Sequence, residues 1–273
     1  MPHLSDQALE FLLMRLIPLL PKPPRRGPRG MPLVDRVRIA FSYAREGVTW
    51  RGLARILGQA PSTLWDNVRP VYKALASLTP VLPDGSPLET FGQVISWCQN
   101  HGLTMVIDGT ELPCQRPEDA DEQALCYSGK KKRHTLKTIV FTDCLGRIIW
   151  LTPLAPGAMH DFAALLDSGA VDELKSADLE YWVDSGFQGL GSRLAHVVLP
   201  EKRRKGEKLS RASKFFNRLL ARERVVVEHA NARLKSWRCI APHQVLHRNV
   251  DENLYVAWLL TSYQQAWPRT APD

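Results

Sequence analysis

The chain has 273 residues, 44% of them hydrophobic and 23% charged, so it is long enough to bury a sizeable core and has an ordinary globular composition. Lys and Arg number 36 against 28 Asp and Glu, which gives a net charge of +8 and a pI near 9.4. This basic balance favours a polyanionic partner, most simply nucleic acid. The five cysteines include no C-x-x-C pair, which argues against a disulfide framework and a zinc ribbon.

No targeting or membrane segment is expected. Arg15 interrupts the most apolar N-terminal stretch, residues 11–20, and no basic region precedes it, unlike a signal peptide. No run of residues reaches the roughly 18 apolar positions that a membrane helix needs. We therefore expect a cytoplasmic protein without a membrane partner, associated with the nucleoid if it binds DNA.

The first 30 residues are expected to form a short helix followed by an extended arm. Residues 5–17 have amphipathic helical spacing, with Ser5 as the N-cap. Residues 21–30 are rich in Pro, Gly and positive charge and fit neither a helix nor a central strand. Two interpretations stay open for them: a solvated tether, or a basic arm along a DNA groove.

Residues 31–79 read as a helical DNA-binding domain. Within it, residues 50–68 fit a helix-turn-helix: Ala54 is small where two helices cross, Gly58 lies at the turn, and Leu64 packs the second helix back on the first. The alternative is a plain helical hairpin. The side chains expected to reach DNA are Arg51, Ser62, Thr63, Trp65, Asn67 and Arg69.

After a linker and helix at residues 80–103, the chain changes to an α/β pattern that we assign to one catalytic domain, residues 104–273. Short β-branched and aromatic runs predict a mixed five-stranded sheet with flanking helices. The strands are expected at residues 104–107, 136–141, 148–154, 181–183 and 197–199, and the helices at residues 161–175, 207–236 and 251–266.

Three acidic residues have positions that suit a metal site. Asp108 follows the first strand, Asp184 ends the fourth, and Glu228 lies on the late helix. In a ribonuclease-H-like sheet the first and fourth strands are neighbours, so these carboxylates would converge. Converging carboxylates repel unless cations neutralise them, and their hard oxygen ligands suit Mg²⁺ or Mn²⁺. Two ions per site would support phosphoryl transfer.

Each of these carboxylates also has a structural interpretation. Asp108 and Asp184 precede glycines as in ordinary turns, and Glu228 could pair with Arg224 on its own helix. Asp161 is expected to cap the helix after the third strand, and it is the alternative for the second catalytic carboxylate.

Basic and histidine residues surround the expected site. Arg224, Glu228 and Lys235 share one helix face, where cations beside a metal-binding carboxylate would hold a phosphate. Lys131 and Lys132 belong to a basic run that would contact phosphates, as would residues 201–208. The possible accessory residues, which could orient water or phosphate, are His134, His160 and Asp161.

The chain resembles the DDE transposases of bacterial insertion sequences, specifically the IS-five group and its Harbinger relatives. The motifs that carry the resemblance, in order, are Ile107–Glu111, Tyr127–His134, Pro156–Asp161, Val183–Gly189 and Arg224-x3-Glu228-x6-Lys235. A tyrosine often stands three residues before the arginine of the last motif in such transposases, and Ala221 stands there in this chain.

The resemblance implies a ribonuclease-H-like fold preceded by an all-α helix-turn-helix domain, with Asp108, Asp184 and Glu228 as the catalytic triad. It implies metal-dependent cleavage at transposon ends and transfer of the 3′-hydroxyl to target DNA. The partners would be the terminal inverted repeats and target DNA, and a homodimer would hold two ends together. The candidate dimer contacts are residues 5–17 and the last helix, with Tyr255, Trp258 and Leu259, although both could be core elements.

Three alternatives stay open. The chain could be a transposase-derived DNA-binding protein, although it retains all three carboxylates, or a nuclease that cuts without joining. A zinc hydrolase using His134, His160 and His229 is the third, and these three histidines are not spaced as an H-x-x-x-H or H-E-x-x-H pair.

Overall fold

The computed structural model describes residues 4–21, 31–203, 206, 208–240 and 245–268. It divides into two compact units, and each is described by itself. The helical unit comprises residues 1–87 and 234–273, and the sheet unit comprises residues 88–233. The expected basic arm at residues 22–30 lies outside the described residues.

The helical unit contains most of the helices expected at the two ends of the chain. Its elements are α1 (Asp6–Leu16), η1 (Ile17–Leu19), α2 (Leu33–Glu46), α3 (Trp50–Ile56), α4 (Pro61–Ser77), η3 (Arg238–Ile240), η4 (His247–Asn249) and α10 (Val250–Ala266). Ser5 caps α1 as expected, because its Oγ accepts a hydrogen bond from the Ala8 amide at 3.1 Å.

Helices α3 and α4 form the pair expected over residues 50–68. Gly58, in the turn between them, has a φ of +63°, which glycine adopts without strain. Ala54 on α3 and Leu64 on α4 are fully buried. The expected packing of the two helices is therefore present, and DNA binding by this pair stays a prediction.

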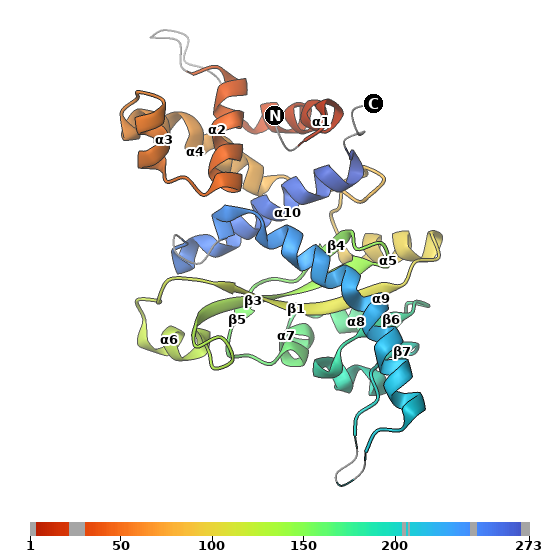
Figure 1. Ribbon diagram of the computed structural model, residues 1–273. Helices are drawn as coiled ribbons and strands as arrows, with labels where there is room; N and C mark the ends of the chain where they lie inside the picture. Colours follow the sequence, from red (N-terminus) through yellow and green to blue (C-terminus); the bar gives the residue numbers. More distant parts are fainter. Residues whose placement is uncertain (1–3, 22–30, 204–205, 207, 241–244, 269–273) are drawn as a thin grey trace. The chain divides into compact units, whose positions relative to one another are not determined.

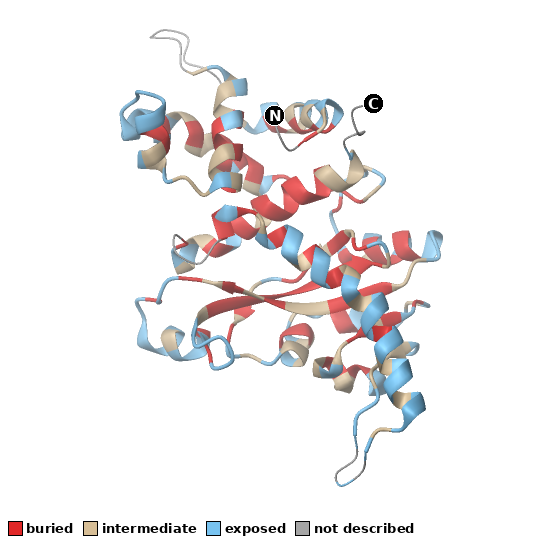
Figure 2. Cartoon of the chain, in the orientation of Figure 1, coloured by how far each residue is buried: buried red, intermediate tan, exposed pale blue. Residues whose placement is uncertain are grey.

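Helix α10 forms the core of the helical unit together with α4. Asn253 links three segments: its Oδ1 accepts from the Tyr72 hydroxyl at 2.8 Å, and its Nδ2 donates to the Cys239 carbonyl at 2.8 Å. Arg69 of α4 makes a bidentate ion pair with Glu252, at 2.7 and 2.8 Å. Figure 2 shows α10 buried along nearly its whole length.

This packing differs from the expectation that residues 104–273 form one domain. A helix that is apolar on all sides needs cover from several neighbours, and in this chain α2 and α4 supply part of it. The C-terminal residues therefore complete the helical unit, which the chain leaves after Pro87 and enters again at Leu234.

The sheet unit contains the α/β pattern that the sequence predicts. Its elements are α5 (Phe91–Asn100), β1 (Met105–Pro113), α6 (Ala120–Cys126), β2 (Tyr127–Ser128), β3 (Arg133–Asp143), β4 (Ile148–Leu151), β5 (Ala155–Pro156), α7 (Asp161–Asp167), α8 (Ala170–Leu174), β6 (Tyr181–Val183), η2 (Ser185–Ser192), β7 (Val197–Val198) and α9 (Arg211–Lys235), whose last two residues are assigned to the helical unit.

Strand β1 lies at the centre of a curled mixed sheet of strand order β2-β3-β1-β6-β7, of which Figure 1 labels every strand except β2. It pairs antiparallel with β3 and parallel with β6, so the expected first and fourth strands are neighbours. Strands β4 and β5 both pair with β3. The described residues thus form seven strands rather than five, because β2 and β5 are two-residue strands without a hydrophobic pattern of their own.

The length of β1 changes the setting of Asp108. The strand was expected to end at residue 107, but it continues to Pro113, so Asp108 lies inside the strand opposite Val140. Within the described residues, no helix has the length and apolarity needed to cross a membrane.

Candidate active site of the sheet unit

Asp108 is held by two side chains of α9. Its Oδ2 accepts from the Nδ2 of Asn231 at 2.9 Å, and its Oδ1 accepts from the Nη2 of Arg224 at 3.4 Å. The Asp108 side chain is 21% exposed and that of Arg224 is 15% exposed. These contacts fasten the middle of α9 to the central strand through the first expected catalytic carboxylate.

Glu228 lies on α9 between these two contacts. It comes four residues after Arg224 and three before Asn231, and residues at such spacings share one helix face. Val227 and Ala230 next to it are fully buried, whereas Glu228 is exposed. Glu228 therefore lies at the exposed edge of the α9 face whose Arg224 and Asn231 touch Asp108.

Asp184 stands where β6 ends. The parallel register pairs Ile107 with Val183, so the next residues, Asp108 and Asp184, are at neighbouring positions of adjacent strands. The Oδ1 of Asp184 accepts from the Gly186 amide at 2.7 Å and caps η2. This contact turns the chain sharply after the strand and leaves Asp184 partly exposed at the strand end.

The carboxylates influence one another through charge. The pKa of Asp108 is raised to about 6, chiefly by burial and to a smaller extent by the negative charges of Asp184 and Asp161, against the lowering effect of the Arg224 guanidinium. Asp108 therefore lies within electrostatic reach of two other acidic residues.

Because the pKa of Asp108 is raised, we expect Asp108→Asn to become more stable relative to wild type as the pH rises. The folded chain holds a proton on Asp108 between about pH 4 and 6 that the unfolded chain has lost, so folded stability falls across this window. The free energy of unfolding of Asp108→Asn minus that of wild type should grow by about 2 kcal/mol from pH 4 to pH 7. Urea denaturation in EDTA measures it.

Asp178→Asn is the control for this measurement, because it removes a carboxylate whose side chain is 93% exposed rather than buried. A difference between Asp108→Asn and wild type that stays constant from pH 4 to pH 7 would contradict the burial of the Asp108 charge.

Asp161 lies on the opposite face of β1. Successive strand residues point to opposite faces, and a Cβ built on Gly109 would lie only 2.7 Å from the Cγ of Asp161. Since Asp108 points to α9, Asp161 packs behind it, in the space that the glycine leaves. This position weakens Asp161 as the alternative second catalytic carboxylate.

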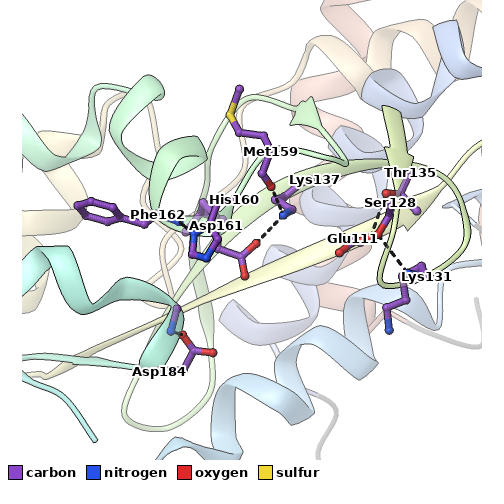
Figure 3. A network of polar contacts seen from close by, with 12 residues as sticks. Glu111, Ser128, Lys131, Thr135, Lys137, Met159, His160, Asp161, Phe162 and Asp184 are labelled. Carbon is purple, nitrogen blue, oxygen red and sulfur yellow. Dashed lines mark hydrogen bonds and ion pairs between the residues drawn. The ribbon is translucent and has the colours of Figure 1, made fainter. Parts of the chain in front are cut away.

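Asp161 is anchored there by a buried lysine. The Nζ of Lys137 on β3 lies 2.7 Å from the Asp161 Oδ1 and also donates to the Met159 carbonyl, as Figure 3 shows. The Lys137 side chain is 6% exposed. The expectation that Asp161 caps α7 is wrong, because His160 occupies the cap and its Nδ1 accepts from the Phe162 amide at 3.4 Å.

The donor set around Asp108 fits a divalent cation. Hard carboxylate and amide oxygens are the ligands such ions prefer, and the Oδ1 of Asn231 is buried without a hydrogen-bond partner in the described part of the chain. The carboxylates are not gathered to ligand distances: the described residues contain no cluster of three or more His, Cys, Asp or Glu side chains that could hold an ion. Asp108, Asp184, Glu228 and Asn231 are the residues that would have to close around it.

A family model described as DDE superfamily endonuclease matches residues 107–262, which include all three expected catalytic carboxylates. The chain belongs to this family. No solved structure matches the chain.

Two curated relatives of this DDE endonuclease are similar along most of their length. A probable transposase for insertion sequence element IS702 from Microchaete diplosiphon is 31% identical over 222 residues, which are 81% of this chain and 75% of the relative. A putative transposase for insertion sequence element IS112 from Streptomyces albus G is 26% identical over 221 residues, 79% of this chain and 74% of the relative.

The histidines of the DDE endonuclease are not arranged as a zinc site. His160 caps α7, and the His134 ring packs edge-on against Tyr127 at 5.6 Å between centroids. His229 is exposed on α9. Since the described residues contain no cluster of metal-binding side chains that includes these histidines, nothing in the geometry favours the zinc hydrolase.

The other expected DNA-binding residues are mostly exposed. Lys131 and Lys132 lie in the turn between β2 and β3, and Lys235 is the last residue of α9. In the helical unit, the exposed members of the set are Arg51, Ser62, Thr63 and Trp65. Asn67 is half-buried, and its Nδ2 donates to the Thr63 carbonyl at 2.7 Å.

Arg69 has a structural partner. Its guanidinium is held by Glu252 and lies 5.4 Å from the Trp65 ring centroid, so it stabilises the helical unit. A contact of Arg69 with DNA stays a prediction, and it would require this ion pair to open.

Two site residues, Asn231 and Lys137, were not expected from the sequence. Asn231 lies three residues after Glu228 on a helix, so the same spacing argument that joins Arg224 to Glu228 would have included it. For Lys137 no such signal exists. A single lysine in an apolar strand reveals its ion pair only when the partner from another element is known.

Proposed function

We propose that this DDE endonuclease is a DNA transposase that cleaves DNA at the ends of its mobile element and joins the resulting 3′-hydroxyl to target DNA. The observation that carries the proposal is the position of Asp108 on β1, in contact with Arg224 and Asn231 of α9, the helix that bears Glu228, and beside Asp184 at the end of the neighbouring strand. The names of the two relatives support the same reaction.

Asp108, Asp184 and Glu228 would hold the divalent ions, Mg²⁺ or Mn²⁺, with two ions per site. Such ions activate the attacking oxygen and stabilise the leaving oxygen of a phosphodiester. Arg224 holds Asp108 in place and would turn to a phosphate when an ion takes over the Asp108 carboxylate. Its Nε is buried without a hydrogen-bond partner among the described residues, which supports this second role.

DNA would be bound by both units. The exposed side chains of α3 and α4 would contact the terminal inverted repeat, and Lys131, Lys132 and Lys235 would contact phosphates. Transposition requires two ends held together, so we propose a homodimer. Trp258 and Leu259 are buried in the helical unit. Tyr255 is half-buried, so the more exposed candidate contact is α1, where Met14 is 54% and Phe11 41% exposed.

The proposal is tested by incubating the protein with labelled DNA that carries the element's own ends, together with target DNA, in Mg²⁺, Mn²⁺ or EDTA. Metal-dependent cleavage and joining that Asp184→Asn abolishes is the expected result. Cleavage without joining would identify a nuclease instead. Tight DNA binding without chemistry in any metal would identify a transposase-derived binding protein.

A further inference from the structure

We propose that Asn231 is a fourth residue of the divalent-ion site, an inference that rests on the proposed function. Its amide nitrogen orients Asp108, and its carbonyl oxygen is an additional neutral ligand for the ion or for a water molecule bound to it. In the last sequence motif, Arg224-x3-Glu228-x6-Lys235, this residue is one of the unspecified positions.

The contact between Asn231 and Asp108 fixes which way the amide points. An ionised carboxylate only accepts hydrogen bonds, so the group that faces the Asp108 Oδ2 at 2.9 Å is the Nδ2 of Asn231. The Oδ1 of Asn231 must then point elsewhere, and it is buried without any hydrogen-bond partner among the described residues. Buried amide oxygens are nearly always paired in folded proteins, and an exception calls for an explanation.

An ion site explains this unpaired oxygen. Asn231 is one turn from Glu228 on α9, and its amide group touches Asp108, one of the carboxylates that would hold the cation. A fourth carboxylate would add to the repulsion among Asp108, Asp184 and Glu228, whereas an amide oxygen adds a ligand without charge. Since its nitrogen also holds Asp108, one side chain would both orient a ligand and serve as one.

The α9 helix provides a matched control. Asn217 on the same helix also uses both ends of its amide: its Oδ1 accepts from the Glu201 amide at 2.8 Å, and its Nδ2 donates to the Glu201 carbonyl at 2.9 Å. Both atoms of Asn217 are therefore satisfied within the chain, and it lies fourteen residues before Asn231. Its replacement removes two hydrogen bonds but no ion ligand.

The test is Mn²⁺ binding to the full chain, measured by electron paramagnetic resonance of the free ion, for wild type, Asn231→Ala, Asn231→Asp and Asn217→Ala. Asn231→Ala should lower the Mn²⁺ affinity by about 10- to 100-fold, as removal of ligand-orienting groups does. Asn231→Asp retains an oxygen ligand but loses the donor to Asp108, so its affinity should fall between wild type and Asn231→Ala. Asn217→Ala should bind Mn²⁺ as wild type does.

Thermal unfolding of the four proteins in EDTA separates ion binding from folding. A merely structural role would lower the melting temperature of Asn231→Ala in EDTA without changing Mn²⁺ affinity, and that result overturns the inference. If wild type does not bind Mn²⁺, or binds it with an affinity that Asp184→Asn leaves unchanged, the proposed function fails as well. Binding that depends on Asp184 but not on Asn231 overturns only the role of Asn231.

Discussion

Replacing Glu228 with Gln is expected to slow DNA cleavage by about a thousandfold, because a metal-assisted displacement gains several kcal/mol from its ions and each 1.4 kcal/mol is a factor of ten. Glu228 lies between the two residues of α9 that hold Asp108, so its carboxylate is the one that α9 would bring to the ion. Gln keeps the size and polarity of the side chain and removes only its charge. Affinity for the element's ends should change by less than about twofold, because the exposed cations that contact phosphates are untouched.

The control is Glu223→Gln, which removes an exposed carboxylate from the same helix, five residues before Glu228. It should cleave DNA at the wild-type rate. Single-turnover cleavage and a gel-shift titration measure the two quantities. Equal loss of cleavage in both variants would mean that the charge of α9 matters, not the position of Glu228.

Replacing Asp161 with Asn should lower the free energy of unfolding by about 3 kcal/mol, because it leaves the ammonium group of Lys137 buried without a counter-charge. The Lys137 side chain is 6% exposed and that of Asp161 is 32% exposed. The loss of stability therefore comes mainly from the buried charge of the lysine. Lys137→Met should cost less, since Asp161 can still reach water. The double variant should be about as stable as Lys137→Met alone, because the unpaired charge is gone.

Urea denaturation of these variants measures the effect. The exposed Lys175–Asp172 pair provides the comparison, with side chains 49% and 77% exposed. Asp172→Asn should leave the stability unchanged, because exposed ion pairs contribute little. If Asp161→Asn also leaves it unchanged, the ion pair with Lys137 does not form in solution.

The central part of the sheet could be predicted from the sequence because its strands are short apolar runs in a definite order. The pairing of β1 with β6, and with it the closeness of Asp108 and Asp184, follows from that order. The end of β1 could not be predicted. Asp108-Gly109 is an ordinary turn signal, but in this protein the strand continues through the glycine, whose missing side chain leaves room for a carboxylate from α7.

Contacts between elements that are far apart in the sequence could not be predicted either, because a residue's own pattern does not identify its partner. Arg69 fits a DNA-reading helix by spacing, yet its partner Glu252 lies 183 residues away. Helix α10 was expected from its hydrophobic pattern, but a helix buried on all sides does not reveal which elements cover it. Helix α7 is capped by His160, one residue before the expected cap, because the Asp161 carboxylate pairs with Lys137 instead.

The division of the helical unit between the two ends of the chain affects how the protein is made. Residues 1–87 leave the ribosome first, but the helix that fills their core begins only at Val250. At 5 to 20 residues per second, the intervening chain takes roughly 10 to 30 seconds to synthesise. During that time Tyr72 has no Asn253 to bind and Arg69 has no Glu252. The sheet unit, whose residues are contiguous, can fold first, so the amino-terminal helices must be kept from aggregating, by chaperones or by their charge, until α10 arrives.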